Sequence, residues 1–275
     1  MTANIVDGKA IAESIYTDLK PKFARLPGRA GGRKIKLGIL VVGHNAVTES
    51  FVGIKTRNAE ALGVEMIRVN VPGTSDMGKI EQAAQRLVDT TDAVIIQLPL
   101  PPTVDTNQIL AAVPLEKDVD ALNPNVAEEE RRVHAPVALA VVEILNRSNV
   151  KIEDAHTVVV GAGRLVGKPA AWLLKSLGAQ VSMFTLEEGS IEDLKDAGIV
   201  VSGAGNPGFI KPEHLKRGVA LIDAGTSELN KKIAGDADPA CAEVASVFTP
   251  VPGGVGPVAV AMIFKNLFDL VESTR

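Results

Sequence analysis

Short runs of valine, isoleucine and leucine alternate along the chain with segments of helical periodicity, and this alternation restricts the possible folds more than any other feature. Buried parallel strands read as continuous apolar runs, whereas the helices that join them repeat with a period of about 3.6 residues. The clearest group contains the strands Lys36–Gly43, Val64–Val71 and Ala93–Leu98 and the helices Glu49–Gly63 and Asp76–Asp89. Elements in this order predict a parallel sheet with right-handed crossover connections.

A second α/β pattern follows in the other half of the chain. It contains the helices Pro136–Ser148 and Gly167–Leu177, the helical turn Ile191–Asp196, and the strands Thr157–Gly161, Ala179–Thr185, Ile199–Gly203 and Val219–Asp223. Terminal helices are expected at Asp7–Arg25 and Val258–Ser273, and a flexible connector at Pro27–Arg33. Because 275 residues correspond to about two domains, the sequence predicts two α/β units joined by helices.

The composition excludes several classes of protein. Lys and Arg number 29 against 33 Asp and Glu, and no long basic run exists, so binding to nucleic acid is not expected. No apolar run reaches the roughly 18 residues of a transmembrane helix, so no membrane partner is expected either. The single cysteine, Cys241, fits a reducing compartment, and we expect a cytoplasmic protein that handles a small molecule.

A glycine-rich turn joins the strand and the helix of the segment VVVGAGRLVGKP, residues 158–169. Glycines in such a turn let the backbone approach a pyrophosphate, and the helix N-terminus supplies free N–H donors. The spacing of Gly161, Gly163 and Gly167 is one residue longer than the usual dinucleotide fingerprint. The alternative is a plain strand-to-helix turn that needs small residues. Beyond the next strand, Glu187 could bind a ribose diol, whereas Glu188 is better interpreted as solvated loop.

Lys55 and Gln97 are candidate site residues at the carboxyl ends of predicted strands, where α/β sheets place ligands. Lys55 shares a helical face with Phe51, an apolar neighbour that could desolvate the amine and lower its pKa. The alternative is an ordinary solvated lysine. Gln97 ends a buried strand and must find polar partners, either the Lys55 amine or the backbone of the proline-rich loop that follows.

Two aspartates, Asp118 and Asp120, lie in KDVDALNP, where aspartates are usually turn formers. No histidine accompanies them at ligand spacing, so we expect no metal. The charged run Glu128–Arg132 is interpreted as solvated surface. Neither a GxSxG nor an HExxH motif occurs, which argues against a serine hydrolase and a zinc peptidase.

Taken in order along the chain, these motifs resemble the bifunctional methylenetetrahydrofolate dehydrogenase/cyclohydrolase (FolD-like) family over essentially the full length. The segments that carry the resemblance are VDGKAIA, FVGIK, QLPLP, KDVDALNPN, VVG…LVGKP, IDAGT, GDAD and TPVPGGVGP. The resemblance implies oxidation of 5,10-methylene-tetrahydrofolate to the methenyl form with NADP or NAD. It also implies hydrolysis of the methenyl form to 10-formyl-tetrahydrofolate.

The family pattern also implies an organisation and a site. Residues 1–121 with 256–275 would form a folate-binding catalytic domain, to which the C-terminal helix returns, and 122–255 a Rossmann-type dinucleotide-binding domain. The folate cleft would lie between the domains, and the protein would form a homodimer. By resemblance Lys55 is the catalytic lysine, Gln97 its hydrogen-bonding partner and Asp120 the anchor of the pterin ring.

Further contacts are implied by the same alignment of motifs. Substrate contacts are expected from Thr48, Phe51, Leu98, Pro99, Pro252, Gly253 and Gly254. Cofactor contacts are expected from Gly161, Ala162, Gly163, Leu165, Val166, Gly167, Leu186, Glu187, Gly205 and Thr226.

Several positions depart from the family pattern. Phe51 replaces the usual tyrosine, and Thr48 the usual serine, while HAPVA at 134–138 replaces PCTPxG and Ala259 replaces a threonine. In the cofactor loop, the usual Gly-Arg-Ser is Gly161–Gly163, and the usual Ser-Arg after the next strand is Leu186–Glu187. Both charged partners of a 2′-phosphate are thereby lost, which favours NAD over NADP.

These losses keep two alternatives open. One is a dehydrogenase without cyclohydrolase activity, because hydroxyl groups near the substrate are missing. The other is a catalytically silent folate- or nucleotide-binding homologue, against which the retention of Lys55, Gln97 and Asp120 argues.

Overall fold

The chain forms two compact units in the computed structural model, which describes residues 3–29, 32–44, 46–185, 187–229 and 232–273. The six-strand unit consists of Met1–Ser14 and His134–Met262, and the three-strand unit of Ile15–Val133 and Ile263–Arg275. Two helices, α1 (Gly8–Arg29) and α7 (Val255–Ser273), contribute residues to both units. The predicted two-part α/β architecture is confirmed.

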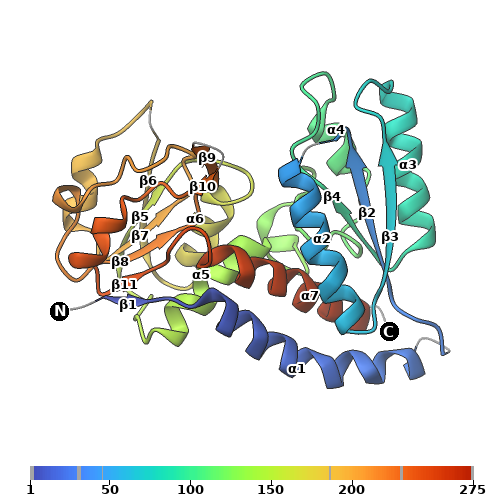
Figure 1. The fold of residues 1–275 in the computed structure, drawn as a ribbon, viewed down its shortest axis with the longest axis horizontal. Helices are drawn as coiled ribbons and strands as arrows, with labels where there is room; N and C mark the ends of the chain where they lie inside the picture. Colours follow the sequence, from blue (N-terminus) through green and yellow to red (C-terminus); the bar gives the residue numbers. More distant parts are fainter. Residues whose placement is uncertain (1–2, 30–31, 45, 186, 230–231, 274–275) are drawn as a thin grey trace. The chain divides into compact units, whose positions relative to one another are not determined.

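The three-strand unit is the predicted strand-helix-strand-helix-strand pattern (Figure 1). Its elements are β2 (Lys36–Val42), α2 (Ala46–Ala61), β3 (Glu65–Val71), α3 (Met77–Thr90), β4 (Ala93–Ile96), α4 (Thr106–Ala111) and the 3-10 turn η1 (Glu128–Glu130). The strands pair in parallel in the order β3-β2-β4, and Ile39 of β2 lies between Arg68 and Ile95 of its neighbours.

Side chains of β3 alternate between the two helices that flank the small sheet. Ile67 and Val69 pack against the apolar core that includes Leu87 of α3. Arg68 instead bonds Glu49 of α2, with N–O distances of 2.9 and 2.5 Å. The helices α2 and α3 therefore cover opposite faces of the sheet, as right-handed crossovers require (Figure 1).

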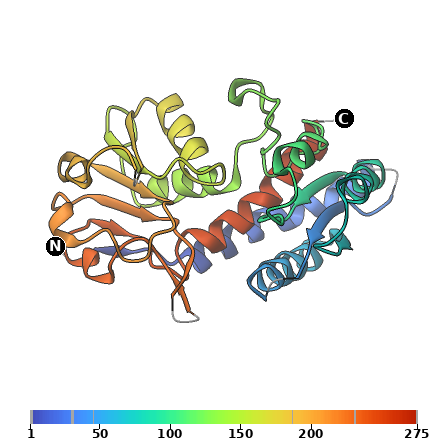
Figure 2. The same cartoon turned by 90° about the horizontal axis from the view of Figure 1, so that it is seen from above.

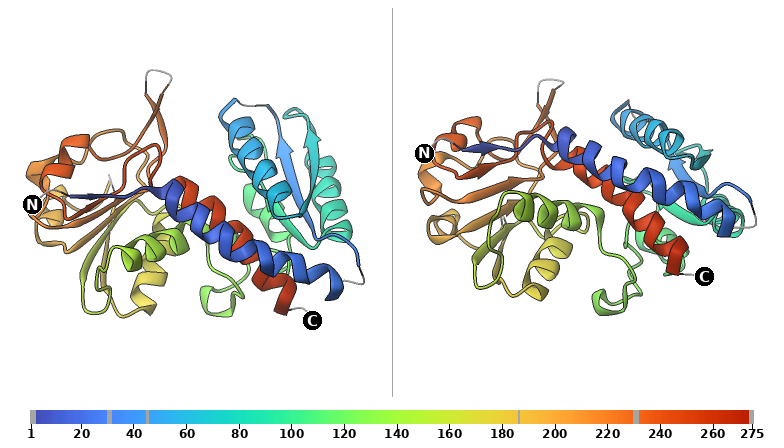
Figure 3. Two further views of the ribbon diagram at one scale, coloured as in Figure 1. Left: turned by 60° about the horizontal axis from the view of Figure 1, so that its bottom comes forward. Right: turned by 90° about the horizontal axis from the view of Figure 1, so that it is seen from below.

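Helices α1 and α7 lie side by side in the three-strand unit (Figure 3). Tyr16 meets Phe264 with ring centroids 6.0 Å apart, and Phe23 meets Phe268 at 5.8 Å. Leu26 of α1 is also only 2% exposed, and α1 extends to Arg29. The predicted end at Arg25 and the connector from Pro27 were therefore wrong for residues 27–29; residues 30 and 31 of that connector lie outside the described ranges.

The six-strand unit carries a parallel sheet in the order β1-β11-β8-β7-β5-β6. Its strands are β1 (Asn4–Ile5), β5 (His156–Val160), β6 (Gln180–Phe184), β7 (Ile199–Ser202), β8 (Ala220–Asp223) and β11 (Val247–Phe248), with an antiparallel hairpin of β9 (Ser227–Leu229) and β10 (Lys232–Ala234). Its other helices are α5 (Pro136–Arg147), α6 (Gly167–Ser176), and the 3-10 turns η2 (Ile191–Asp196), η3 (Pro212–His214) and η4 (Pro239–Glu243). In Figure 2, α5 packs beside α6 on one face of this sheet.

The direction of winding reverses at β5, which has β6 on one side and β7 on the other. Open parallel sheets place ligands at the carboxyl ends of the strands at such a switch point. The glycine-rich turn follows β5, so the sheet puts the predicted cofactor loop where a ligand is expected.

Within the described ranges, no helix is both long and apolar enough to cross a membrane.

Candidate active site

Lys55 projects from α2 into a buried position in the three-strand unit, with only 8% of the residue exposed. Its Nζ donates a hydrogen bond to Gln97 Oε1 at 2.8 Å. Gln97 Nε2 in turn donates to the carbonyl oxygen of Leu98 at 2.8 Å. The contact expected between Lys55 and Gln97 is confirmed, and the interpretation of Lys55 as a solvated lysine was wrong. Both partners considered for Gln97 are used at once, because its oxygen and its nitrogen face different groups.

Burial and charge act in opposite directions on Lys55 and Asp120. Burial lowers the pKa of the Lys55 amine, and the nearby Asp120 carboxylate partly restores it. Burial likewise raises the pKa of Asp120, and Lys55 opposes that rise. Because desolvation outweighs the attraction for each group, the Lys55 amine loses its proton more easily than an ordinary lysine does. A lysine amine with a lowered pKa is a candidate proton acceptor.

Hydrogen bonds from three directions hold the loop that carries Asp120. The Lys117 amine donates to the carbonyl oxygens of Val88 and Thr91 at the end of α3. Asn266 of α7 donates to the carbonyl oxygen of Val119 at 2.9 Å. Asp118 accepts the backbone N–H of Asn123 at 2.7 Å, as a turn former does. The loop therefore presents Asp120 from a fixed backbone.

Arg131 lies against this loop, so the prediction that the whole of Glu128–Arg132 is solvated was wrong. Its side chain is only 8% exposed, and its Nη1 lies 3.9 Å from Asp118 Oδ2. Nη2 donates to the carbonyl oxygen of Asn123 at 3.1 Å, and the η1 turn brings Glu128 within 3.2 Å of Nε. The pKa of Asp118 is raised to about 6, mainly by burial and also by Asp120, whereas the Asn123 N–H hydrogen bond and Arg131 act to lower it.

The remaining predicted substrate residues fall into two groups. Thr48 and Phe51 precede Lys55 by seven and four residues on α2, so the three share a helical face, and Leu98 and Pro99 directly follow Gln97. The segment Pro252–Gly254 belongs to the six-strand unit. There the loop packs against the start of α1, where the N–H of Gly8 donates to Gly253 O at 3.0 Å. A Cβ atom on Gly8 would lie 1.8 Å from Gly254 O, which explains the glycine of the VDGK motif.

A cavity of about 260 Å³ opens at the carboxyl ends of β5, β7 and β8 in the six-strand unit. It is lined by Gly163, Arg164, Leu165, Val166, Gly203, Gly205, Ala224, Gly225 and Thr226. Five of the residues predicted to contact the cofactor are among them, and Gly161 and Gly167 shape the turn beneath it. Gly161 has a φ of +94°, and a Cβ atom on Gly167 would lie 1.7 Å from Gly161 O. The turn therefore requires glycine and leaves backbone groups open to a ligand.

The other predicted cofactor residues lie close to this turn or beyond the strand next to it. Ala162 follows Gly161 directly and is half-buried. Glu187 is exposed after the end of β6, in a turn where the Thr185 N–H donates to Glu188 O at 2.9 Å. Leu186 lies outside the described residues.

Two buried carboxylates in the six-strand unit, Asp223 and Asp236, are site-forming residues to which the sequence assigned no role. Each is at most 1% exposed, and together they bond the loops that follow β7 and β8. The available signal was the position of Asp223 at the end of an otherwise apolar strand, ALID, where an aspartate must find buried donors.

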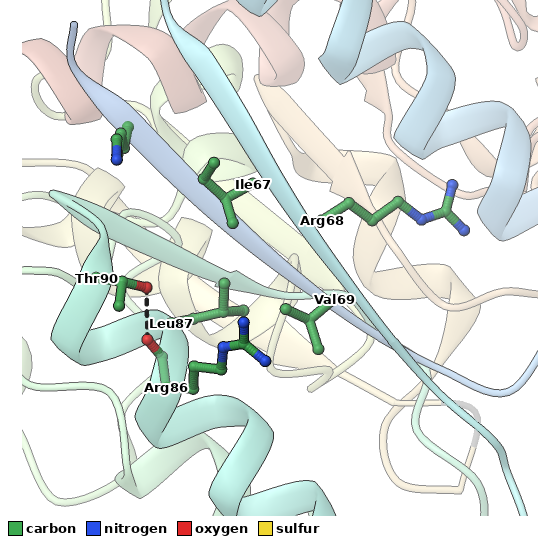
Figure 4. Close-up of a pocket in the computed structure, with 7 residues that line it drawn as sticks. Ile67, Arg68, Val69, Arg86, Leu87 and Thr90 are labelled. Atoms are coloured by element: carbon green, nitrogen blue, oxygen red, sulfur yellow. Dashed lines mark hydrogen bonds between the residues drawn. The ribbon is translucent and has the colours of Figure 1, made fainter.

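A further cavity of about 410 Å³ lies between β3 and α3 (Figure 4). Its lining consists of Lys36, Ile67, Arg68, Val69, Arg86, Leu87 and Thr90, and includes no predicted site residue. The Thr90 hydroxyl donates to Arg86 O at 2.6 Å, and the Arg68 side chain points away from Ile67 and Val69. We therefore regard it as a surface groove of the small sheet.

A parallel sheet with a glycine-rich turn, a helix start and a cavity at its switch point defines a Rossmann-type dinucleotide-binding enzyme. Residues 6–120 match the model for the tetrahydrofolate dehydrogenase/cyclohydrolase catalytic domain. Residues 135–275 match the model for the NAD(P)-binding domain of the same family. The chain belongs to the tetrahydrofolate dehydrogenase/cyclohydrolase family.

Individual relatives match this chain over its full length. The chain is 36% identical over 309 residues to the bifunctional protein FolD of Koribacter versatilis (strain Ellin345), covering 100% of this chain and 99% of the relative. It is 33% identical over 284 residues to FolD of Staphylococcus aureus (strain Newman), covering 100% and 98%. The solved FolD of Trypanosoma brucei, complexed with NADP and an inhibitor, has a TM-score of 0.92 at 31% identity, covering 100% and 99%.

Proposed function

We propose that Lys55, Gln97 and Asp120 form the folate site at which this chain carries out both reactions of its family. The dehydrogenase oxidises 5,10-methylene-tetrahydrofolate to the methenyl form with NAD(P), and the cyclohydrolase converts this to 10-formyl-tetrahydrofolate. The observation that carries the proposal is the buried Lys55 amine, hydrogen-bonded at 2.8 Å to Gln97 and lowered in pKa by burial.

In the hydrolysis, Lys55 acts as the base. A water oxygen attacks the methenyl carbon and forms the new C–O bond, while the water proton passes to the neutral Nζ. The positive charge of the bound methenyl group further favours the neutral amine, because a nearby cation lowers the pKa of a lysine. Gln97 Oε1 orients the amine throughout, since its own amide is fixed by Leu98. The ring nitrogen then takes this proton from Lys55 as its bond to the former methenyl carbon breaks, and the new hydroxyl group releases its own proton to water as it becomes the formyl carbonyl.

Asp120 anchors the pterin ring in this proposal. A carboxylate accepts hydrogen bonds from both an amino group and a ring N–H, and such charge-assisted bonds are stronger than neutral ones. Thr48, Phe51, Leu98, Pro99 and the segment Pro252–Gly254 complete the folate contacts. The assignment of 1–121 with 256–275 to folate and 122–255 to the dinucleotide is part of the same proposal.

The cavity beside the glycine-rich turn is lined by small residues that suit part of a nicotinamide dinucleotide, which when bound accepts the hydride of the oxidation. Gly161, Gly163 and Gly167 keep side chains away from the phosphates, and the start of α6 offers N–H donors. We propose NAD as the preferred form. Ala162 gives a 2′-phosphate no hydrogen bond, and Glu187 is an exposed negative charge after β6 that can accept from a ribose diol.

We also propose that the protein is a cytoplasmic homodimer, as the family resemblance implies. Light scattering coupled to size-exclusion chromatography tests the oligomeric state, and a mass of one chain contradicts it.

A single assay tests the function. Purified protein is given 5,10-methylene-tetrahydrofolate with NAD or with NADP at one ionic strength, and both dinucleotide reduction and methenyl absorbance are followed. Reduction accompanied by decay of added methenyl-tetrahydrofolate supports both activities. Reduction with a stable methenyl signal identifies a monofunctional dehydrogenase, and no turnover identifies a silent binding protein.

A further inference from the structure

Two aspartates at the base of the β9–β10 hairpin accept hydrogen bonds with both of their carboxylate oxygens. Asp223 ends β8 and Asp236 follows β10, and they are 1% and 0% exposed. Buried carboxylates are costly unless they are hydrogen-bonded, so the partners of these two residues indicate what they hold together.

Asp236 fixes the loop after β7. Its Oδ2 accepts the Ser202 hydroxyl and the Ala204 N–H, both at 2.7 Å, and its Oδ1 accepts the Asn206 N–H at 2.8 Å. These three donors span residues 202–206, which include Gly203 and Gly205 of the cavity lining. One wall of the cavity is thus attached to a single carboxylate.

Asp223 fixes the loop after β8 in the same way. Its Oδ1 accepts the N–H groups of Gly225 at 2.9 Å and Asp236 at 3.1 Å, and its Oδ2 accepts Ala237 N–H at 2.8 Å. The loop contributes Ala224–Thr226 to the cavity lining. Asp223 therefore joins a second part of the wall to the backbone that carries Asp236.

Two glycines complete the reciprocal arrangement. A Cβ atom on Gly225 would lie 2.4 Å from Asp236 Cγ, and one on Gly235 would lie 2.1 Å from Asp223 Oδ2. Each carboxylate thus packs against the glycine beside the other. The spacing of IDAGT and GDAD in the sequence follows from this packing, because neither glycine tolerates a side chain.

We infer that Asp223 and Asp236 are positioning residues for the dinucleotide, acting through the two loops that supply five of the nine cavity-lining residues. The inference deepens the cofactor site proposed above and rests on it. Neither carboxylate needs to touch the ligand, because the oxygens of both already accept from the protein. Their effect on the reaction is to fix the loops before the dinucleotide binds, which lowers the ordering cost of binding.

The decisive variant is Asp236→Asn. Both oxygens of Asp236 accept from N–H or O–H groups, and an amide nitrogen cannot accept, so either orientation of the asparagine leaves a donor facing a donor. The matched control is Asp238→Asn in the same GDAD segment, since Asp238 caps η4 and pairs with Lys211. Gly163→Val is the direct test of the cavity, because a Cβ atom there meets no protein atom within 4 Å.

The readouts are the dissociation constant of NADH, from fluorescence titration of the full chain, and methenyl hydrolysis without dinucleotide. We expect Asp236→Asn to weaken NADH binding by at least about tenfold, because the released loop must then be ordered when the ligand binds, and hydrolysis to stay within about twofold. Asp238→Asn should match the unmodified protein in both. Equal NADH affinity in Asp236→Asn, with loss in Gly163→Val, overturns the positioning role and leaves the cavity assignment standing.

Two other results are also informative. Unchanged binding in Gly163→Val refutes the cofactor cavity itself and, with it, this inference. If Asp236→Asn does not fold, as loss of methenyl hydrolysis would reveal, Ser202→Ala replaces it, because it removes one of the three donors to Asp236. Its NADH affinity should fall by about threefold or more, the lower range for one hydrogen bond, and an unchanged affinity overturns the role.

Discussion

Replacing Lys55 with methionine removes the amine and keeps a side chain of similar length. The variant lacks Lys55 Nζ, the atom that lies 2.8 Å from Gln97 Oε1 and carries the proposed base function. A positioned general base contributes about 10²- to 10⁴-fold to a rate, so methenyl hydrolysis should fall by at least about 100-fold. Dinucleotide binding should be unchanged, because the cavity belongs to the six-strand unit.

The fold should survive this change because two effects on stability oppose each other. Loss of a hydrogen bond from a charged donor costs about 1.5–3 kcal/mol. Removal of a buried ammonium relieves the desolvation that lowers the pKa of Lys55, but it also leaves Asp120 without the positive charge that opposes its burial, so that Asp120 takes up a proton more readily. The free energy of unfolding, measured in urea, therefore separates loss of the base from loss of the fold, because a 100-fold loss of rate corresponds to about 2.7 kcal/mol of activation free energy.

The pH profile gives the same variant a second signature. Because the base is the neutral amine, hydrolysis by the unmodified protein should rise with pH as Lys55 loses its proton, and this limb should be absent in Lys55→Met. The assay is the decay of methenyl absorbance across a pH series, and Arg57→Met, an exposed cation on the same helix, is the control. Hydrolysis in Lys55→Met equal to that of Arg57→Met would refute the base role.

Three further predictions use the same preparations. Asp120→Ala should raise the folate KM or reduce turnover by at least about tenfold, since a charge-assisted contact is worth roughly 1.5–3 kcal/mol, and unchanged kinetics would return Asp120 to a turn former. The unmodified chain should show a higher kcat/KM with NAD than with NADP, and Ala162→Arg with Glu187→Arg should shift preference toward NADP; a clear NADP preference at the outset contradicts this. The pKa of Asp118 is raised, mainly by burial, from 3.8 to about 6. Ionisation of Asp118 therefore destabilises the folded state by up to about 3 kcal/mol, and this destabilisation is absent below about pH 4 and complete above about pH 6. The free energy of unfolding of Asp118→Asn in urea should therefore improve relative to the unmodified protein as pH rises from about 4 to 7, and a pH-independent difference contradicts it.

Local patterns were sufficient for the parts of the fold that are regular over several residues. The strands β2, β3 and β4 and the helices α2 and α3 follow from their periodicity, and the pairing of Lys55 with Gln97 follows from the way parallel strands end at one edge. The two-residue strands β1 and β11 are too short for a period, and they pair only because chain segments over 240 residues apart meet.

Contacts between segments that are distant along the chain also explain why the roles of some site residues were not predicted. The position of Asp223 in ALID indicates burial, but most of the donors that hold Asp223 and Asp236 lie on other segments of the chain, so these partners cannot be identified from either motif alone. Arg131 was mistaken for surface because its neighbours Glu129 and Glu130 are exposed, whereas the η1 turn returns its side chain to Asp118.

The hydrogen bond from Asn266 to Val119 O affects when the three-strand unit can complete its folding during synthesis. Lys55, Gln97 and Asp120 emerge from the ribosome more than 140 residues before Asn266, and domains generally fold as they emerge. Here, however, the three-strand unit includes Ile263–Arg275, and the backbone beside Asp120 receives its Asn266 donor only from that last segment. The part of the three-strand unit that is made first is therefore completed only when the segment with Asn266 has emerged, and the loop beside Asp120 gains its full set of hydrogen bonds only then.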